Sequence, residues 1–250
     1  MLLLLPPSET KQIGGTGLTI SQVHLSYGQL NEARDQILAS LLEVSANKDL
    51  GSKVLKLSKR QLEDLDRNLE IPNAPTMAAF ERYTGTLYKA IGVNSFSTNE
   101  VENMRRHILI QSALFGLISA TDRIPWYRLS AETRLPDLEI KRVWNEHQPK
   151  AWERLVDSPI IDLRSKSYVE LSPVPENLES FWVEVVSEVD GKRKALNHFN
   201  KKAKGDLVGA FVRQERPAQT LKELANLAKK VGLKLTVEEN KIILVTPETL

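Results

Sequence analysis

The chain has 250 residues, 41% of them hydrophobic and 26% charged, and a formal net charge of +2 at pH 7. It is long enough to bury a core, and its net charge is too small to indicate any particular partner. The absence of cysteine excludes a disulfide framework and a thiolate metal site, and it fits a reducing cytoplasm.

The opening MLLLLPP is not expected to be a targeting signal. It has no positively charged n-region, its leucine run is only four residues long, and Pro6 and Pro7 end that run. No other stretch approaches the roughly 18 apolar residues that a membrane span needs. We therefore predict a soluble, cytoplasmic protein without a membrane partner.

The first elements in chain order are a strand and three helices. Residues 2–5 are typical of a short buried strand. Residues 31–44 carry apolar side chains at helical spacing and predict an amphipathic helix. Residues 58–69 and 75–83 predict two further helices, and Pro75 lies near the start of the second.

The middle of the chain begins with a clear helix start. Ser97 and Glu100 have the spacing of a capping box, so a helix is expected to begin there and to end near residue 107. Residues 108–117 are apolar enough for a buried strand, although periodicity alone also allows a buried helix. Residues 141–156 predict a helix that Pro149 breaks or restarts.

The last third alternates again between strand and helix patterns. Residues 160–163 predict a buried strand, and residues 181–189 predict a strand with one wet face. Helices are expected over about 200–214 and 220–231, followed by a hairpin of strands 233–237 and 242–245. We therefore predict an α/β (mixed α+β) fold with a mixed sheet flanked by helices, in a single domain over residues 1–250.

The stretch HFNKKAKGDLVGAF places three lysines where the helix over 200–214 begins: Lys201, Lys202 and Lys204. Ammonium groups are unfavourable at a helix N-terminus, and a bound anion would offset that cost. Asn197 or Asn200 is a candidate N-cap, and Gly205 would let a ligand approach the backbone. A phosphate site and a solvated basic patch both remain open.

Charge is also uneven around these lysines. Residues 157–190 hold eight acidic and two basic side chains, whereas residues 192–216 hold eight basic and two acidic ones. The difference is compatible with adjacent solvated faces or with a concentrated positive patch.

The segment FGLISATDRIPWYRLSAETRL, residues 115–135, is rich in groups that bind ligands. Arg123, Arg128 and Arg134 offer guanidinium donors for phosphate or carboxylate, and Trp126 and Tyr127 offer faces for a base or sugar. Asp122 and Glu132 are candidate acid–base residues, together with Tyr168 further along the chain. A structural loop with internal ion pairs would explain the same residues.

Two shorter segments are weaker candidates. SETK follows the first strand and supplies Ser8, Thr10 and Lys11, and ligands of α/β sheets bind beyond the carboxyl ends of strands. YTGTLY places Gly85 between two tyrosines, Tyr83 among them, and predicts either a pocket-lining loop or a turn.

The common catalytic and metal-binding signatures are missing. GGTG at 14–17 lacks the spacing of a dinucleotide loop and the lysine of a phosphate loop. The four histidines have no metal-ligand spacing, so we predict no metal site and no cofactor. Direct iron binding is correspondingly disfavoured.

Taken in order, these segments resemble the YaaA peroxide-stress protein family. LLLLPPSETK is similar to its opening strand and S-P-A-K-T loop, LIQSALFGLISATDRIPWYRL to its L-S-G-L-Y-G-L-L-R-P-L-D block, IIDLRSKSY to its I-N-L-A-S strand and turn, and HFNKKAKG to its lysine-rich motif. The resemblance points to these residues: Lys11, Tyr83, Gly85, Gly116, Asp122, Tyr127, Arg128, Ser165, Tyr168, Lys201, Lys202 and Gly205.

The sequence departs from the family pattern in its opening loop, which reads P-S-E-T-K, and at three further residues. Ser130 stands where the family has a glutamate, Asp162 where it has an asparagine, and Lys204 where it has an arginine. Chemistry that depends on the missing glutamate would require Glu132 to replace it.

The resemblance implies an α/β fold with a positively charged cleft, DNA binding, and protection against peroxide by limiting iron-dependent damage. It also implies a helix-hairpin-helix element, for which residues 58–83 are the best candidate. Our first hypothesis is a DNA-binding protein whose basic residues contact phosphates. The alternative is an enzyme that acts on a nucleotide or another phosphorylated small molecule in the same cleft.

Overall fold

The computed structural model describes residues 1–189, 192–195 and 199–247. Its strands are β1 (Leu2–Leu5), β2 (Met77–Ala78), β3 (Ile108–Ser112), β4 (Gly116–Ser119), β5 (Arg123–Ile124), β6 (Ile160–Asp162), β7 (Ser180–Val189), β8 (Lys192–Ala195), β9 (Lys234–Glu238) and β10 (Lys241–Thr246). An eight-stranded sheet has the order β4-β3-β1-β6-β7-β10-β9, with β8 paired to β7, and β2 pairs separately with β5.

The sheet is mixed, as expected from the sequence. β1 lies between β3 and β6 and is parallel to both, and β7 is parallel to β6 and β10. The outer strands β4, β8 and β9 are antiparallel to their neighbours. Because β1 is buried on both faces, its leucines form a continuous apolar run, and Leu3 to Leu5 are completely buried.

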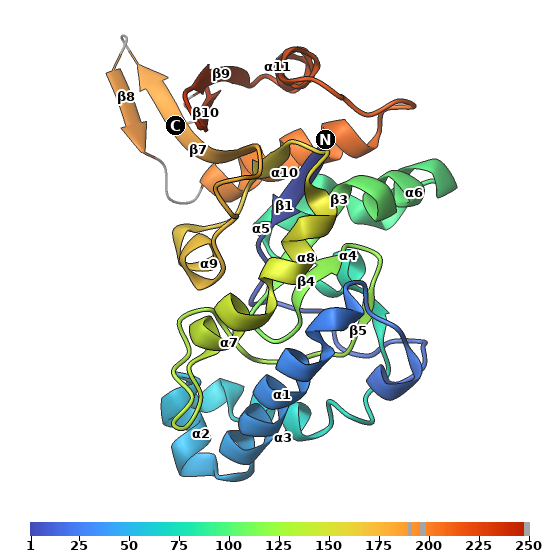
Figure 1. Ribbon diagram of the computed structural model, residues 1–250, viewed down its shortest axis with the longest axis vertical. Coiled ribbons are helices and arrows are strands. Elements are labelled where there is room, and N and C mark those ends of the chain that lie inside the picture. The colour runs from blue at the N-terminus through green and yellow to red at the C-terminus, as the bar shows by residue number, and fades with distance from the viewer. Residues whose placement is uncertain (190–191, 196–198, 248–250) are drawn as a thin grey trace.

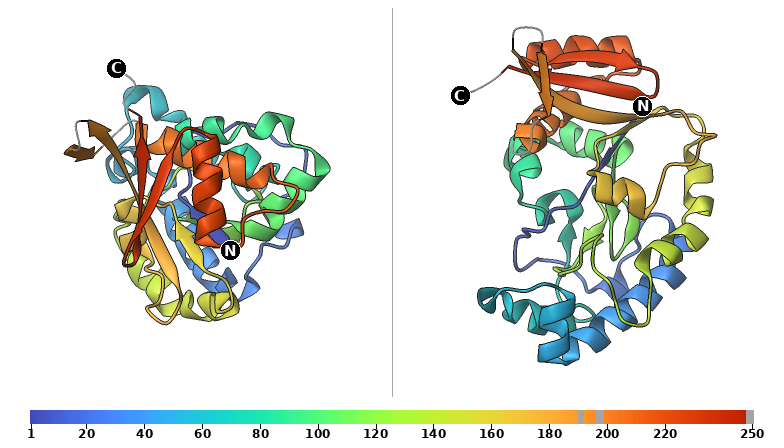
Figure 2. Two further views of the ribbon diagram at one scale, coloured as in Figure 1. Left: turned by 90° about the horizontal axis from the view of Figure 1, so that it is seen from above. Right: turned by 90° about the vertical axis from the view of Figure 1, so that its left-hand side faces the viewer.

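The helices are α1 (Asn31–Ala46), α2 (Lys48–Val54), α3 (Glu63–Leu69), α4 (Ala79–Arg82), α5 (Thr86–Ile91), α6 (Thr98–His107), α7 (Ile140–His147), α8 (Pro149–Trp152), α9 (Lys166–Leu171), α10 (Phe199–Val212) and α11 (Leu221–Lys230). Helices α1, α2 and α3 pack against one another at one end of the molecule, and α11 lies with β9 and β10 at the other end (Figure 1). The side view in Figure 2 shows the same separation.

Several sequence predictions are confirmed. The strand over 2–5 is β1, the helix over 31–44 is α1, and the C-terminal hairpin is β9–β10. The capping box is also present, because the Ser97 N–H donates to the Glu100 carboxylate at 2.6 Å and the Ser97 hydroxyl accepts from the Glu100 N–H at 3.4 Å.

Three predicted boundaries are wrong. Residues 108–117 form two strands rather than one, because Gly116, at φ +63°, starts the return strand β4. The helix predicted over 58–69 is divided into a 3-10 turn over Lys59–Gln61 and the helix α3, which begins at Glu63. The helix predicted over 75–83 is the single turn α4, since Met77 and Ala78 before it pair with β5. Residues 58–83 therefore hold a 3-10 turn, the helix α3 and the single turn α4, rather than the pair of helices expected for a helix-hairpin-helix.

Three short helices, α2, α5 and α9, have seven or fewer residues, and no sequence pattern predicted them. In the described part of the chain, no helix has the length and apolar character needed to cross a bilayer.

Candidate functional site

A pocket of about 510 Å³ lies beyond the carboxyl ends of β1 and β6. We call it the hydroxyl pocket, because six serine and threonine side chains contribute to its wall. Its lining residues are Pro6, Pro7, Ser8, Glu9, Thr10, Gly85, Thr86, Leu87, Tyr88, Ser130, Ala131, Glu132, Ser165, Ser167, Tyr168 and Lys201.

The sheet topology explains why the pocket forms at this place. The chain leaves β1 and returns in β3 on one side of it, and later returns in β6 on the other side. The connections that follow β1 and β6 therefore diverge, and open α/β sheets bind ligands at such a switch point. Residues 6–10 follow β1, and Ser165, Ser167 and Tyr168 follow β6.

The segment after β1 is fixed against the segment before α5. The Gln12 N–H donates to the Arg82 carbonyl at 2.8 Å, and the Thr84 N–H donates to the Thr10 carbonyl at 3.1 Å. A Cβ atom on Gly85 would lie 2.2 Å from the Ser8 hydroxyl oxygen, so any other residue here would require the Ser8 side chain to move. The Ser8 and Thr10 hydroxyls are themselves hydrogen-bonded at 3.1 Å.

A cluster of tyrosines lies beside the hydroxyl pocket. The Tyr83 and Tyr127 hydroxyls are 2.8 Å apart, and the Tyr127 hydroxyl is 2.9 Å from the Ser112 hydroxyl. Tyr88 donates to the Pro6 carbonyl at 2.8 Å, which holds the start of the loop after β1. Burial raises the pKa of Tyr83 well above its ordinary value and that of Tyr127 to about 12, so both phenols are neutral.

Lys11 contacts this cluster rather than a carboxylate. Its Nζ lies 4.2 Å from the centre of the Tyr127 ring and 5.6 Å from that of Tyr83. Burial, followed by the nearby Arg128 guanidinium, lowers the pKa of Lys11 to about 7. Arg128 instead approaches the Glu9 carboxylate, at 3.5 Å.

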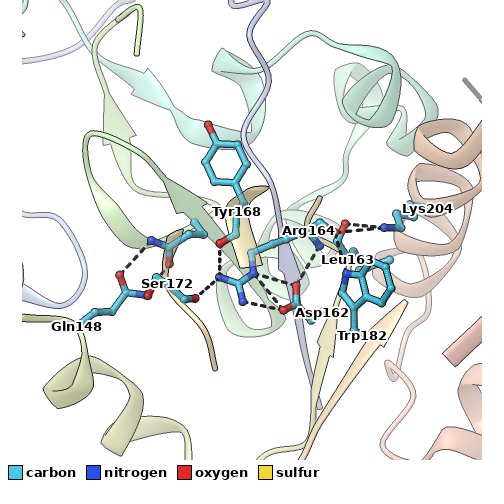
Figure 3. Close-up of polar contacts among 9 residues, drawn as sticks. Gln148, Asp162, Leu163, Arg164, Tyr168, Ser172, Trp182 and Lys204 are labelled. Atoms are coloured by element: carbon cyan, nitrogen blue, oxygen red, sulfur yellow. Dashed lines mark hydrogen bonds and ion pairs between the residues drawn. The ribbon is translucent and has the colours of Figure 1, made fainter. Parts of the chain in front are cut away.

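A buried ion pair supports the wall that α9 contributes (Figure 3). Arg164 is completely buried, and its guanidinium contacts the Asp162 carboxylate at 2.7 Å. It also donates to the carbonyls of Tyr168 and Ser172 at 3.2 and 2.7 Å, in the last turn of α9 and just after it. These contacts fix α9, and with it Ser167 and Tyr168, to the end of β6.

The three lysines of α10 point to different places. Lys201 is exposed and lines the hydroxyl pocket. Lys202 is exposed and pairs with Asp206 at 2.7 Å. Lys204 is buried, and its Nζ donates to the carbonyls of Leu163 and Arg164 at 3.1 and 3.4 Å (Figure 3).

Gly205, which was expected to give a ligand access to the backbone, packs against a neighbouring helix instead. A Cβ on Gly205 would lie 2.3 Å from the Leu87 carbonyl oxygen, so α5 fills the space that a ligand was expected to use. Asn197, one of the two candidate N-caps, lies outside the described residues, and Asn200 is already within α10.

The candidate acid–base residues are separated in the structure. Glu132 and Tyr168 line the hydroxyl pocket, and Tyr168 is hydrogen-bonded to the Ala131 backbone. Asp122 is buried elsewhere and accepts hydrogen bonds from the Ser26 N–H and hydroxyl, both at 2.8 Å, and from the Ser119 N–H at 3.1 Å. These bonds satisfy its carboxylate and tie the loop at Ser26 to β4.

A larger depression of about 1260 Å³ adjoins the hydroxyl pocket, with Ala131, Glu132 and Ser167 lining both. Arg134 lies here. The cations of its wall are Lys53, Lys56, Arg134, Lys141 and Arg142, and the acidic residues are Glu132, Asp137, Glu139 and Glu170. Gly116 lies in neither cavity; a Cβ there would meet the Trp144 ring at 2.5 Å.

Sequence reasoning missed Thr86, Ser167 and Arg164 as parts of this site. Thr86 is next to Gly85 in YTGTLY, and Ser167 is next to Tyr168 in IIDLRSKSY. Their position beside these predicted site residues could have identified them. Arg164 follows a buried strand directly, and no local pattern distinguishes a buried arginine there from an exposed one. Among the residues described, no three histidine, aspartate or glutamate side chains are grouped as a metal site would need.

Together, the fold and the site define an α/β protein with a hydroxyl-lined pocket at the switch point of a mixed sheet. A comparison with protein families matches residues 1–238 to the peroxide stress protein YaaA family. The chain therefore belongs to this family.

Similar proteins of full length support the assignment. The chain is 38% identical over 244 residues to a UPF0246 protein of Corynebacterium glutamicum, a match that covers 96% of each chain. It is 36% identical over 247 residues to a UPF0246 protein of Corynebacterium efficiens, covering 96% of this chain and 97% of the relative. A UPF0246 protein of Streptomyces coelicolor is 32% identical over 238 residues, covering 92% of each.

Proposed function

We propose that this protein binds a phosphorylated small molecule of about nucleotide size in the hydroxyl pocket and acts on it as an enzyme of the peroxide stress response. One observation carries the proposal: an ammonium group, six hydroxyl side chains and a volume of about 510 Å³ occur together at a sheet switch point. Small-molecule sites have volumes of about 300 to 1,000 Å³.

The residues divide into binding and chemical roles. Lys201 neutralises the phosphate, and Ser8, Thr10 and Ser165 donate hydrogen bonds to it. Glu132 and Tyr168 are the candidates for proton transfer, because the other two such groups of the pocket have partners: Glu9 contacts Arg128, and Tyr88 donates to the Pro6 carbonyl. Burial raises the pKa of Tyr168 well above its ordinary value, so the phenol is a proton donor at neutral pH.

A thermal-shift screen with nucleotides and sugar phosphates tests the proposal. A ligand at 100 times its dissociation constant adds about 2.7 kcal/mol to the free energy of unfolding, a shift that such a screen detects. Lys201→Gln should reduce the shift, because it removes the ammonium group of the pocket. Lys202→Gln is the matched control, since Lys202 pairs with Asp206 and does not line the pocket. Equal losses in the two variants, or no shift with any compound, would contradict the proposal.

DNA binding is the second candidate. The observation in its favour is the larger depression, whose five lysine and arginine side chains adjoin the hydroxyl pocket. Cations at intervals along an extended surface suit a phosphate backbone. The four carboxylates in the same wall weaken that attraction, and for this reason we place DNA binding second. Limitation of iron-dependent damage stays a prediction from the family resemblance.

A further inference from the structure

Arg128 has a largely buried side chain whose guanidinium group is poorly supplied with acceptors. The side chain is 18% exposed, and its ion pair is with the Glu9 carboxylate, at 3.5 Å between Nη2 and Oε2. Charge-assisted hydrogen bonds of arginine measure about 2.7 to 2.9 Å, so this pair is loose. Among the described residues, no hydrogen bond is donated by the Arg128 guanidinium; only its backbone groups are bonded, to the Asn68 side chain.

Two other buried arginines show how this fold satisfies such a group. Arg164 donates to the Asp162 carboxylate and to two backbone carbonyls. Arg82 donates to four backbone carbonyls, those of Gln12, Gly14, Pro75 and Ile124. A guanidinium group has five N–H donors, and leaving them without acceptors away from water costs free energy. Arg128 therefore retains donors for an acceptor that the described part of the chain does not supply.

The Glu9 side chain can leave Arg128 without a movement of the backbone. It is 74% exposed, so its carboxylate is largely solvated and the ion pair contributes little to stability. The backbone beside it is fixed, because the Thr84 N–H donates to the Thr10 carbonyl at 3.1 Å. Rotation of the Glu9 side chain alone would therefore uncover the guanidinium group.

The position of Glu9 connects Arg128 to the hydroxyl pocket. Glu9 lines that pocket, so its ion pair places the Arg128 guanidinium at the pocket wall. Lys11 adds positive charge nearby, since burial and then the charge of Arg128 lower the pKa of Lys11 to about 7. An anion bound at Arg128 would relieve the repulsion between these two cationic groups.

We propose that the Arg128 guanidinium is a phosphate subsite of the hydroxyl pocket, which the Glu9 carboxylate occupies in this structure and gives up to a phosphate group of the ligand. Arg128 keeps a negatively charged partner before and after the exchange. Together with Lys201, the subsite suits a ligand that carries two phosphate groups. This inference rests on the proposed function, because it expects the ligand in the hydroxyl pocket.

Glu9 competes with the ligand in this arrangement. The apparent affinity is then the intrinsic affinity multiplied by the fraction of molecules in which Glu9 has turned away from Arg128. Removal of the Glu9 charge should therefore tighten binding, which is the opposite of what the loss of a ligand-binding residue would do.

Pyrophosphate is the probe, and isothermal titration calorimetry at constant ionic strength measures its dissociation constant. Glu9→Gln keeps the size of the side chain and removes the competing charge, so we expect about fivefold tighter binding, the ratio that corresponds to one exposed ion pair. Arg128→Gln should weaken binding about tenfold, because charge-assisted hydrogen bonds to phosphate are lost.

The double variant separates displacement from simple charge repulsion. Without Arg128, Glu9 has no subsite to occupy, so adding Glu9→Gln to Arg128→Gln should not tighten binding further. Glu81→Gln removes the same charge from α4, which lines neither cavity, and should leave the dissociation constant unchanged. Equal tightening by Glu9→Gln with and without Arg128 would overturn the inference.

A chemical measurement gives the answer even if Arg128→Gln does not fold. Phenylglyoxal modifies accessible guanidinium groups, and peptide mass spectrometry maps the modified arginines. Glu9→Gln should accelerate the modification of Arg128, and pyrophosphate should protect it. Failure of pyrophosphate to protect Arg128 would contradict the subsite.

Lys201→Gln separates this inference from the proposed function. If it weakens pyrophosphate binding while Glu9→Gln and Arg128→Gln have no effect, only the inference fails. If it has no effect while Glu9→Gln tightens binding in the presence of Arg128 alone, the proposed role of Lys201 fails and the subsite stands. Absence of pyrophosphate binding in every variant would overturn both.

Discussion

Lys204 is a buried lysine with a structural role rather than a ligand-binding one. Its side chain is buried, and its amine donates to the carbonyls of Leu163 and Arg164, in the segment that leads from β6 to the hydroxyl pocket. Burial lowers its pKa to about 8, although Asp162 and Glu184 oppose the shift. Lys204 therefore positions the pocket wall, and it bears a desolvation cost while it is charged.

This cost predicts a pH-dependent stability. The pKa of Lys204 is about 8 in the folded chain and 10.5 in the ordinary side chain, so between these values the unfolded chain holds more protons. The free energy of unfolding should therefore rise with pH across this window. Between pH 8 and pH 10, the wild-type protein should gain roughly 2 kcal/mol relative to Lys204→Met. Urea unfolding at the two pH values measures the difference, and parallel changes in the two proteins would exclude it.

At the scale of one element, α10 explains why a lysine cluster in the sequence is not a cluster in space. Consecutive helical residues are rotated by 100°, so Lys202 and Lys204 point about 200° apart. The pattern predicted the helix correctly, but it carries no information on which face meets the sheet. In the structure, the face of α10 that carries Gly205 packs against α5. Lys202 is exposed to solvent.

The contact between α10 and α5 gives a second stability prediction. Alanine is favoured over glycine in a helix interior by about 1 kcal/mol, so Gly205→Ala would be stabilising if the site were open. Its Cβ would instead lie 2.3 Å from the Leu87 carbonyl oxygen and 2.6 Å from the Ala90 Cβ. We expect a net loss of about 1 to 3 kcal/mol in denaturant unfolding. Gly28→Ala is the control, because its nearest neighbour is 4.0 Å away; a stabilised Gly205→Ala would refute the packing.

At the scale of the whole molecule, the site depends on long-range strand pairing that no short segment encodes. The sequence predicted both β1 and the strand over 160–163 and suggested a ligand beyond the first of them. It did not reveal that the two strands are neighbours, although this pairing brings Ser8 and Ser165 to one pocket. The family resemblance pointed to Asp122 and Gly116, yet both have structural contacts: Asp122, in the turn between β4 and β5, binds Ser26, and Gly116, at the start of β4, packs against Trp144.

The charge of the molecule as a whole provides the test of DNA binding. With a net charge of only +2, any affinity for duplex DNA must come from a local surface, and the larger depression has the required cations. Log affinity should fall with log salt by about 0.9 for each phosphate that is neutralised. Lys53→Gln combined with Lys141→Gln should make the slope shallower by about 2, because two of these contacts are lost.

Lys222→Gln combined with Lys229→Gln removes the same charge from the exposed side of α11, far along the chain from the depression, and should leave the slope unchanged. Equal effects of the two pairs would mean that attraction depends on net charge alone, and DNA binding at this surface would be excluded.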